Sequence, residues 1–137
     1  MFGDQRMRCD RILLVEDNAL NMELAADLLE AAGFIVLRAA NAEEGIALAN
    51  AEIPALILMD IALPGMDGLC ATGILQRNPN TRQIPVVALT AHAMNGDKEK
   101  ALAVGCVGYI SKPINTRTFA AEAERFLCSV KSLPRAA

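Results

Sequence analysis

Charged residues stand at the ends of short apolar runs, and their types suit chemistry on a phosphoryl group. Glu16 and Asp17 follow the apolar residues 12–15, Asp60 follows a second apolar run, and Lys112 follows a third. Carboxylates can hold a divalent cation or attack phosphorus, and a lysine ammonium can pair with a phosphoryl oxygen. In an open α/β sheet the ligand crevice lies beyond the carboxyl ends of the strands. If each run is a strand, these separate segments deliver their charges to one place.

The length and composition indicate what kind of domain could carry such a site. The 137 residues suffice for one domain with a real core but hardly for two. With 53% hydrophobic residues and no Trp, the core must be built from Ala, Leu, Ile and Val. The net charge of -3 provides no basic face for nucleic acid. Direct binding to DNA or RNA is therefore disfavoured.

The cysteines and the chain ends predict a cytoplasmic protein. Cys9, Cys70, Cys106 and Cys128 form no C-x-x-C pair and have no companion histidine at metal spacing, so we expect free thiols in a reducing compartment. Residues 1–10 are polar and charged, unlike a signal peptide. No apolar run approaches the about 20 residues that span a membrane. We expect a soluble protein that does not bind membranes.

Strand-like and helix-like segments alternate five times along the chain, which is typical of βαβ units and a parallel sheet. The predicted strands cover residues 12–15, 34–37, 56–59, 84–89 and 107–110. The predicted helices cover residues 18–32, 41–49, 67–78, 95–104 and 115–130. We therefore expect one α/β domain over residues 11–131, with an N-terminal extension, 1–10, and a C-terminal tail, 132–137.

The helix boundaries rest on capping signals. The first helix shows apolar residues at Leu20, Leu24, Leu28 and Ala31, which predicts its buried face, and Gly33 provides its stop. The second and third helices each begin after a residue whose side chain can cap a helix. These caps are Asn41 and Asp67.

Four longer motifs lie at the carboxyl ends of the first, third, fourth and fifth predicted strands. They cover residues 15–18 (VEDN), 58–68 (LMDIALPGMDG), 89–91 (LTA) and 109–114 (YISKPI). Together they resemble the receiver domain of two-component response regulators over nearly the whole chain. The resemblance implies a flavodoxin-like, doubly wound, five-stranded parallel sheet of order 2-1-3-4-5 with five flanking helices.

The resemblance also implies an acceptor and a metal. Asp60 would take a phosphoryl group from a partner histidine kinase or histidine phosphotransfer protein. Mg²⁺ favours oxygen ligands and retains several waters, so Glu16, Asp17, Asp60 and the backbone carbonyl of Ala62 make a plausible partial shell. Phosphoryl transfer needs mainly in-line positioning and neutralisation of charge, which this shell would supply.

Other residues would read or modulate the phosphoryl group. Lys112 and Thr90 are expected to contact phosphoryl oxygens, and Tyr109 would turn inward when Thr90 moves. The resemblance suggests that the bond from Lys112 to Pro113 is cis. His92, like Ala62, occupies a position that influences the lifetime of the phosphoryl group in this family.

Each of these residues also has a purely structural interpretation. Glu16 and Asp17 could form an ordinary acidic turn, and Asp60 could cap a short turn. Lys112 could be a solvated charge, and Tyr109 could be a half-buried aromatic residue of a strand rather than a switch. The full set of acids and lysine favours the site interpretation over the separate structural ones.

The implied output is protein contact. Regulators of the stand-alone cell-division and chemotaxis types use a face built from the fourth helix, the fifth strand and the fifth helix to bind a downstream target. Such a chain catalyses only its own phosphorylation and dephosphorylation, and is a monomer or a weak phosphorylation-dependent dimer. Alanines in the last two helices could admit a partner helix or could equally pack inside. They are Ala101, Ala103, Ala120, Ala121 and Ala123.

Three alternatives stay open. The chain could be the receiver module of a hybrid histidine kinase. It could be an Asp-nucleophile phosphatase of the haloacid dehalogenase kind, but such enzymes carry a second acid two residues after the nucleophile, where this chain has Ala62. It could also be a docking module that works without phosphorylation, although such modules usually lack one of the acids or the lysine.

Overall fold

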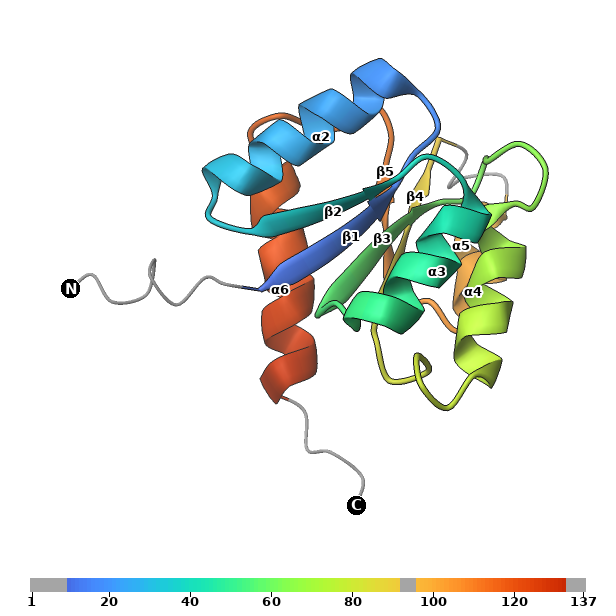
Figure 1. Cartoon of the computed structure of the whole chain (residues 1–137). Coiled ribbons are helices and arrows are strands. Elements are labelled where there is room, and N and C mark those ends of the chain that lie inside the picture. Colours follow the sequence, from blue (N-terminus) through green and yellow to red (C-terminus); the bar gives the residue numbers. More distant parts are fainter. Residues whose placement is uncertain (1–9, 92–95, 133–137) are drawn as a thin grey trace.

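The computed structural model describes residues 10–91 and 96–132, with side chains up to residue 128. Within these residues five parallel strands form one sheet of order β2-β1-β3-β4-β5, which confirms the predicted fold (Figure 1). The strands are β1 Arg11–Val15, β2 Ile35–Ala39, β3 Leu56–Asp60, β4 Val86–Thr90 and β5 Gly108–Ser111. The helices are α2 Ala19–Ala31, α3 Ala42–Glu52, α4 Gly68–Arg77, α5 Asp97–Val104 and α6 Phe119–Ser132.

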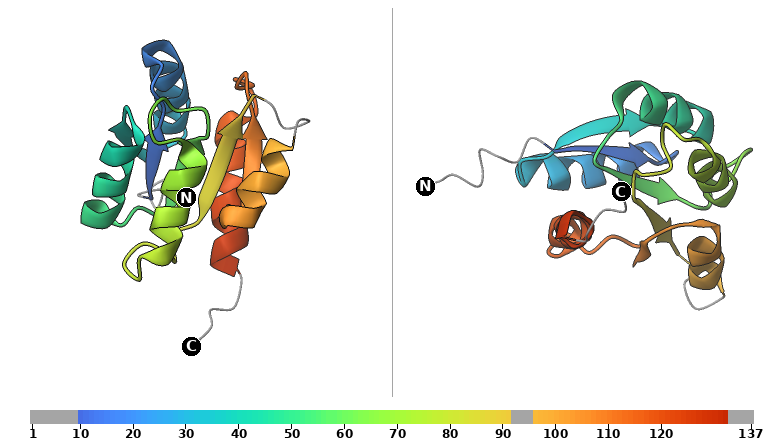
Figure 2. Two further views of the ribbon diagram at one scale, coloured as in Figure 1. Left: turned by 90° about the vertical axis from the view of Figure 1, so that its right-hand side faces the viewer. Right: turned by 90° about the horizontal axis from the view of Figure 1, so that it is seen from below.

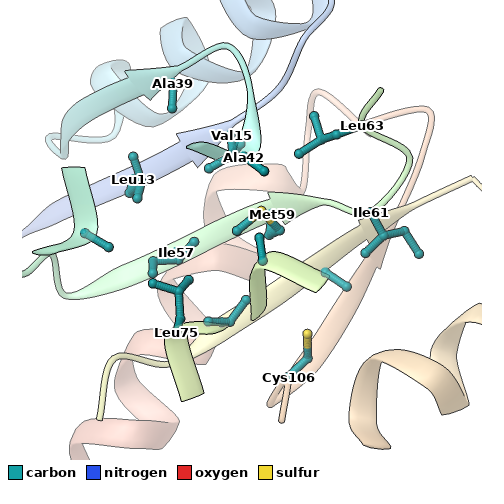
Figure 3. Packing of buried hydrophobic residues seen from close by; sticks show 14 of the residues in the cluster. Leu13, Val15, Ala39, Ala42, Ile57, Met59, Ile61, Leu63, Leu75 and Cys106 are labelled. Carbon is teal, nitrogen blue, oxygen red and sulfur yellow. The ribbon is translucent and has the colours of Figure 1, made fainter. Parts of the chain in front are cut away.

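Helices cover both faces of the sheet, as the end-on views show (Figure 2). Side chains alternate between the two faces along each strand, so one strand supplies both cores. Leu13 and Val15 of β1 lie in the core with α3, α4 and α5 (Figure 3), whereas Ile12 and Leu14 lie in the core with α2 and α6. Strands β1, β3 and β4 are almost completely buried because they are covered on both faces and flanked by other strands.

The strand order places the site. The chain proceeds from β1 outward to β2 and then crosses to β3 on the other side of β1. In a doubly wound sheet, the crevice for ligands forms outside the carboxyl ends of the strands at this reversal. Here the two strands that meet there are β1 and β3, which end in Val15 and Asp60.

The predicted buried face of the first helix is wrong. Leu20 is 82% exposed and Leu24 is 40% exposed, whereas the buried residues of α2 are Ala25, Ala26 and Leu29. The prediction followed the leucines because they are the most hydrophobic residues in the helical pattern. Short alanine side chains let the helix approach the sheet closely, so they form the inner face and leave two leucines in solvent.

The last helix begins four residues later than predicted. Asn115 forms a turn first, because its side-chain oxygen accepts a hydrogen bond from the backbone N–H of Arg117 and its carbonyl accepts from Thr118 and Phe119. Asn favours such local bonds over an immediate helix. Helix α6 then starts at Phe119, which is fully buried.

The cysteines of the described residues are free, as predicted. Cys70 and Cys128 are exposed, whereas Cys106 is buried. Burial raises the pKa of the Cys106 thiol, and a hydrogen bond with Thr72 only partly opposes this. Cys9 lies outside the described residues.

Candidate functional site

The carboxyl ends of the strands place three buried polar side chains at one edge of the sheet. Glu16 directly follows β1 and is bonded through its backbone N–H to Ala39 at the end of β2. Asp60 closes β3 and Thr90 closes β4. Glu16, Asp60 and Thr90 are only 3%, 3% and 2% exposed. Because buried polar groups need partners, this edge of the sheet must contain a connected network.

Lys112 is the centre of that network. Its Nζ lies 3.0 Å from Oε1 of Glu16 and 3.0 Å from Oδ2 of Asp60. Its backbone N–H donates to the carbonyl of Thr90 at 2.8 Å, and its peptide bond to Pro113 is cis, as the resemblance suggested. Lys112 therefore links the ends of β1, β3 and β4 through its side chain and its backbone.

Electrostatics keep Lys112 charged. Burial alone would lower the pKa of its ammonium group, but the hydrogen bonds to Asp60 and Glu16, together with their negative charges, outweigh burial and raise the pKa above its ordinary value. The lysine is thus a permanent cation at neutral pH. Its charge-assisted bonds are stronger than bonds between neutral groups.

Backbone amides fix the second oxygen of each buried acid. Oδ1 of Asp60 accepts from the N–H of Ala62 at 2.9 Å, and Oε2 of Glu16 accepts from the N–H of Asn18 at 3.1 Å. Each carboxylate is therefore held at two points, once by the lysine and once by the chain. The contact from Ala62 uses its amide rather than its carbonyl, so the carbonyl as a metal ligand stays a prediction.

The acids form a cluster suited to a divalent cation. Glu16, Asp17 and Asp60 each offer a carboxylate oxygen, and these oxygens lie within 4.8 Å of one another. Three carboxylates and one ammonium leave a formal excess of two negative charges, three minus one. Asp17 is exposed, so the cluster opens to solvent on that side. An all-oxygen set with room for water fits Mg²⁺.

Gly68 packs against the backbone at the end of β3, and its role was not predicted from the sequence. A Cβ at this position would lie 2.3 Å from the carbonyl oxygen of Asp60 and 2.7 Å from the Cα of Ile61. Only a glycine lets α4 begin so close to the end of β3. The signal in the sequence is the second glycine of the PGMDG motif, directly after the cap Asp67, whose side chain accepts from the N–H of Cys70.

Thr90 and Tyr109 contact the first turn of α5. The hydroxyl of Thr90 donates to Oδ2 of Asp97 at 3.2 Å, and Nζ of Lys98 lies 5.3 Å from the ring centroid of Tyr109. No sequence signal would have found these partners, because their approach depends on how α5 packs on the sheet. His92 lies outside the described residues.

The face beside Tyr109 is hollowed. A cavity of about 370 Å³ lies between β5 and α6, lined by Tyr109, Ile110, Glu122, Arg125 and Phe126. Of the alanines in the last two helices, two are core residues. These are Ala101 and Ala123, whereas Ala103 and Ala121 are exposed and Ala120 is half-buried.

The fold and the site define a receiver domain, and the chain belongs to the response regulator receiver domain family, whose model matches residues 12–124. Among curated proteins, it is 48% identical over 108 residues to the polar-differentiation response regulator DivK of Brucella anthropi, covering 79% of this chain and 88% of the relative.

Solved structures give the same family. The chemotaxis response regulator CheY4 of Vibrio cholerae matches with a TM-score of 0.80 at 26% identity, over 85% of this chain and 98% of that one. The receiver domain of a sensor histidine kinase from Pseudomonas aeruginosa matches with a TM-score of 0.80 at 35% identity, over 90% and 99% of the two chains. That structure holds a magnesium ion in its active site cleft.

Proposed function

We propose that Asp60 is the phosphoryl acceptor of this response regulator. The observation that carries the proposal is the placement of Asp60 beside Lys112 in a cluster of three acids at the switch point of the sheet. The donor would be a phosphohistidine on a histidine kinase or a histidine phosphotransfer protein.

The chain's own residues can perform the transfer. An oxygen of the Asp60 carboxylate attacks phosphorus, and the P–N bond to the donor imidazole breaks with its electron pair passing to nitrogen. Lys112, which already contacts Asp60, pairs with a phosphoryl oxygen as a point charge, and the Thr90 hydroxyl donates to another. Catalysis is then mostly positioning and charge neutralisation.

A magnesium ion fits this scheme as the chain's cofactor. Glu16, Asp17 and Asp60, with the carbonyl of Ala62, would hold it. When bound, it neutralises charge on the phosphoryl oxygens. The magnesium in the Pseudomonas receiver supports the same chemistry here.

The output we propose is protein contact through the face formed by α5, β5 and α6, which carries the cavity beside Tyr109. Phosphorylation would bias an existing equilibrium between two forms of this face. Residues 11–131 would act as the receiver domain, with residues 1–10 and 132–137 outside it. A monomer or a weak phosphorylation-dependent dimer is expected.

The setting we propose is the cytoplasm, where a histidine kinase presents its phosphohistidine. Among the described helices, none has the length and apolar character to cross a bilayer. Receiver domains are not classical enzymes. We infer that this chain catalyses only its own phosphorylation and dephosphorylation.

The alternatives are less favoured. A haloacid dehalogenase-type phosphatase requires an acid where Ala62 stands. A docking module without phosphorylation would not need the intact set of acids and lysine. A receiver module of a hybrid kinase is less favoured because the relatives at 47–48% identity are named as response regulators.

Intact mass spectrometry tests the acceptor. The chain is incubated with Mg²⁺ and acetyl phosphate, and we expect one added phosphoryl group that hydroxylamine removes. The adduct should be absent with a chelator and in Asp60→Asn, and should persist in Asp67→Asn, which changes an exposed acid of the neighbouring loop but keeps a capping side chain. An adduct on Asp60→Asn, or none on the unaltered chain, would overturn the proposal.

A further inference from the structure

Two consecutive residues of α5 hold the two expected switch residues. Asp97 accepts the hydrogen bond from the Thr90 hydroxyl at 3.2 Å, and Lys98 places its ammonium 5.3 Å from the centre of the Tyr109 ring. Thr90 and Tyr109 lie on neighbouring strands, with Ala88 of β4 in register with Tyr109. The first turn of α5 therefore contacts both residues through which phosphorylation would be read.

The bond from Thr90 to Asp97 excludes the proposed bond to a phosphoryl group. A threonine hydroxyl has one hydrogen to donate, and an ionised carboxylate can only accept. In this structure the Thr90 hydroxyl donates to Asp97. If it donates to a phosphoryl oxygen, it can no longer form a full hydrogen bond with Asp97. The two acceptors compete for the same hydrogen.

Helix α5 is held weakly enough to respond. It has eight residues, of which Ala101 is the buried one, and its N-cap Gly96 makes no side-chain hydrogen bond to the helix. Segments with few buried contacts are the ones that move at low cost. The contacts from Asp97 to Thr90 and from Lys98 to Tyr109 join its first turn to the sheet.

We propose that Asp97 is a positioning residue that holds the Thr90 hydroxyl in the unphosphorylated chain, and that its release frees the first turn of α5 and withdraws Lys98 from Tyr109. This inference rests on the proposed function, because the competing acceptor is a phosphoryl group on Asp60. Asp97 stabilises the unphosphorylated form relative to the phosphorylated one. By linkage, removing it favours the phosphorylated form to the same extent.

Beryllofluoride, which occupies the place of a phosphoryl group on a carboxylate, provides the test. Tyr109 is the only tyrosine and the chain has no Trp, so the ring signals of tyrosine in an NMR spectrum report on this residue alone. Titrations compare the unaltered chain with Asp97→Ala and with Glu99→Ala, which removes an equal charge from the same turn.

We expect Asp97→Ala to bind beryllofluoride about threefold to tenfold more tightly, as loss of a competing charged hydrogen bond allows. Its Tyr109 signals without ligand should already lie partway to the bound position. Glu99→Ala should stay within about twofold of the unaltered chain. Asp97→Asn, which keeps a weaker acceptor of the same shape, should fall between, and it serves if Asp97→Ala unfolds.

A double-mutant cycle separates competition from simple charge removal. In a Thr90→Val background no hydroxyl remains to compete for, so Asp97→Ala should change affinity no more than Glu99→Ala does. An equal gain with and without Thr90, or no gain over Glu99→Ala, overturns the role of Asp97. Failure of the unaltered chain to bind beryllofluoride or to gain a phosphoryl group on Asp60 would instead overturn the proposed function.

Discussion

Helices α4 and α5 both follow a strand that ends in a site residue, yet the fold attaches them in opposite ways. Helix α4 has a side-chain cap at Asp67 and buries four residues, Gly68, Ala71, Thr72 and Leu75. Helix α5 begins after Gly96, in the left-handed conformation with a φ of 91° and no side-chain cap, and buries Ala101.

The contrast separates two tasks. A phosphoryl acceptor must stay in place, because small displacements cost much of the rate. A switch needs an element that two states can share at similar free energy. The proposed acceptor Asp60 lies against the firmly anchored α4, while Thr90 and Tyr109 contact the loosely anchored α5.

The largest effect that would test this contrast comes from Gly68→Ala. The new Cβ would overlap the backbone of Asp60 and Ile61, which cannot rotate away, so we expect a loss of about 3 kcal/mol in the free energy of unfolding. Urea denaturation measures it. The matched control is Gly73→Ala in the same helix, where only the flexible end of Arg77 lies near, at 3.5 Å. This control should gain up to about 1 kcal/mol. Equal losses would contradict firm anchoring of α4.

Gly108→Ala would likewise create a steric overlap, here between β5 and α6. Its Cβ would lie 2.3 Å from Cε1 of Phe126, but this neighbour is a half-buried ring rather than backbone. The ring can turn, so we expect a loss of about 1 kcal/mol, recovered in part by adding Phe126→Leu. A loss as large as that of Gly68→Ala would show that β5 and α6 are as rigid as the acceptor side.

Substitutions at the N-terminal ends of the two helices should have effects no larger than that of Gly108→Ala. Asp67→Ala removes the bond to the N–H of Cys70, 2.8 Å long, and should lower the free energy of unfolding by about 1 kcal/mol. Glu99→Ala in the first turn of α5 should cost no more than about 0.5 kcal/mol, because only the interaction with the helix dipole is lost. Thermal unfolding of the two variants measures both losses. A larger loss for Glu99→Ala than for Asp67→Ala would contradict the difference in anchoring between α4 and α5.

The smallest effect concerns pH. The raised pKa of Lys112 means that the folded chain binds this proton more tightly than the unfolded chain does. The stabilisation is therefore complete below the ordinary value of 10.5 and is lost as the pH rises through the higher folded value. We expect the stability difference between the unaltered chain and Lys112→Gln to hold steady from neutral pH to about 10 and to shrink above it. A difference that already shrinks between about pH 7 and about pH 10 would contradict this assignment.

The sequence predicted the central strands and the acidic edge because both depend on local signals. Continuous apolar runs bounded by turns identify strands buried on both faces, and residues directly after such strands must meet at one edge. Asp60, Glu16 and Lys112 could thus be placed together from their positions in the sequence alone.

The remainder depends on packing that no local pattern encodes. The inner face of α2 consists of alanines that a hydrophobic pattern ranks below Leu20 and Leu24. The bond from Thr90 to Asp97 depends on how α5 docks on the sheet, and the closeness of Gly68 to Asp60 depends on the path of the loop between them. Each arises from contacts between separate elements.

Hydrogen exchange of the backbone amides tests the central claim most directly. Exchange is compared along α4 and α5 in the unaltered chain and in Asp60→Asn, with and without acetyl phosphate and Mg²⁺. We predict that phosphorylation changes exchange in the first turn of α5 and leaves α4 unchanged, and that Asp60→Asn shows no change in either helix. A response confined to α4, or an equal response in both helices, would contradict the division between a fixed acceptor and a movable switch.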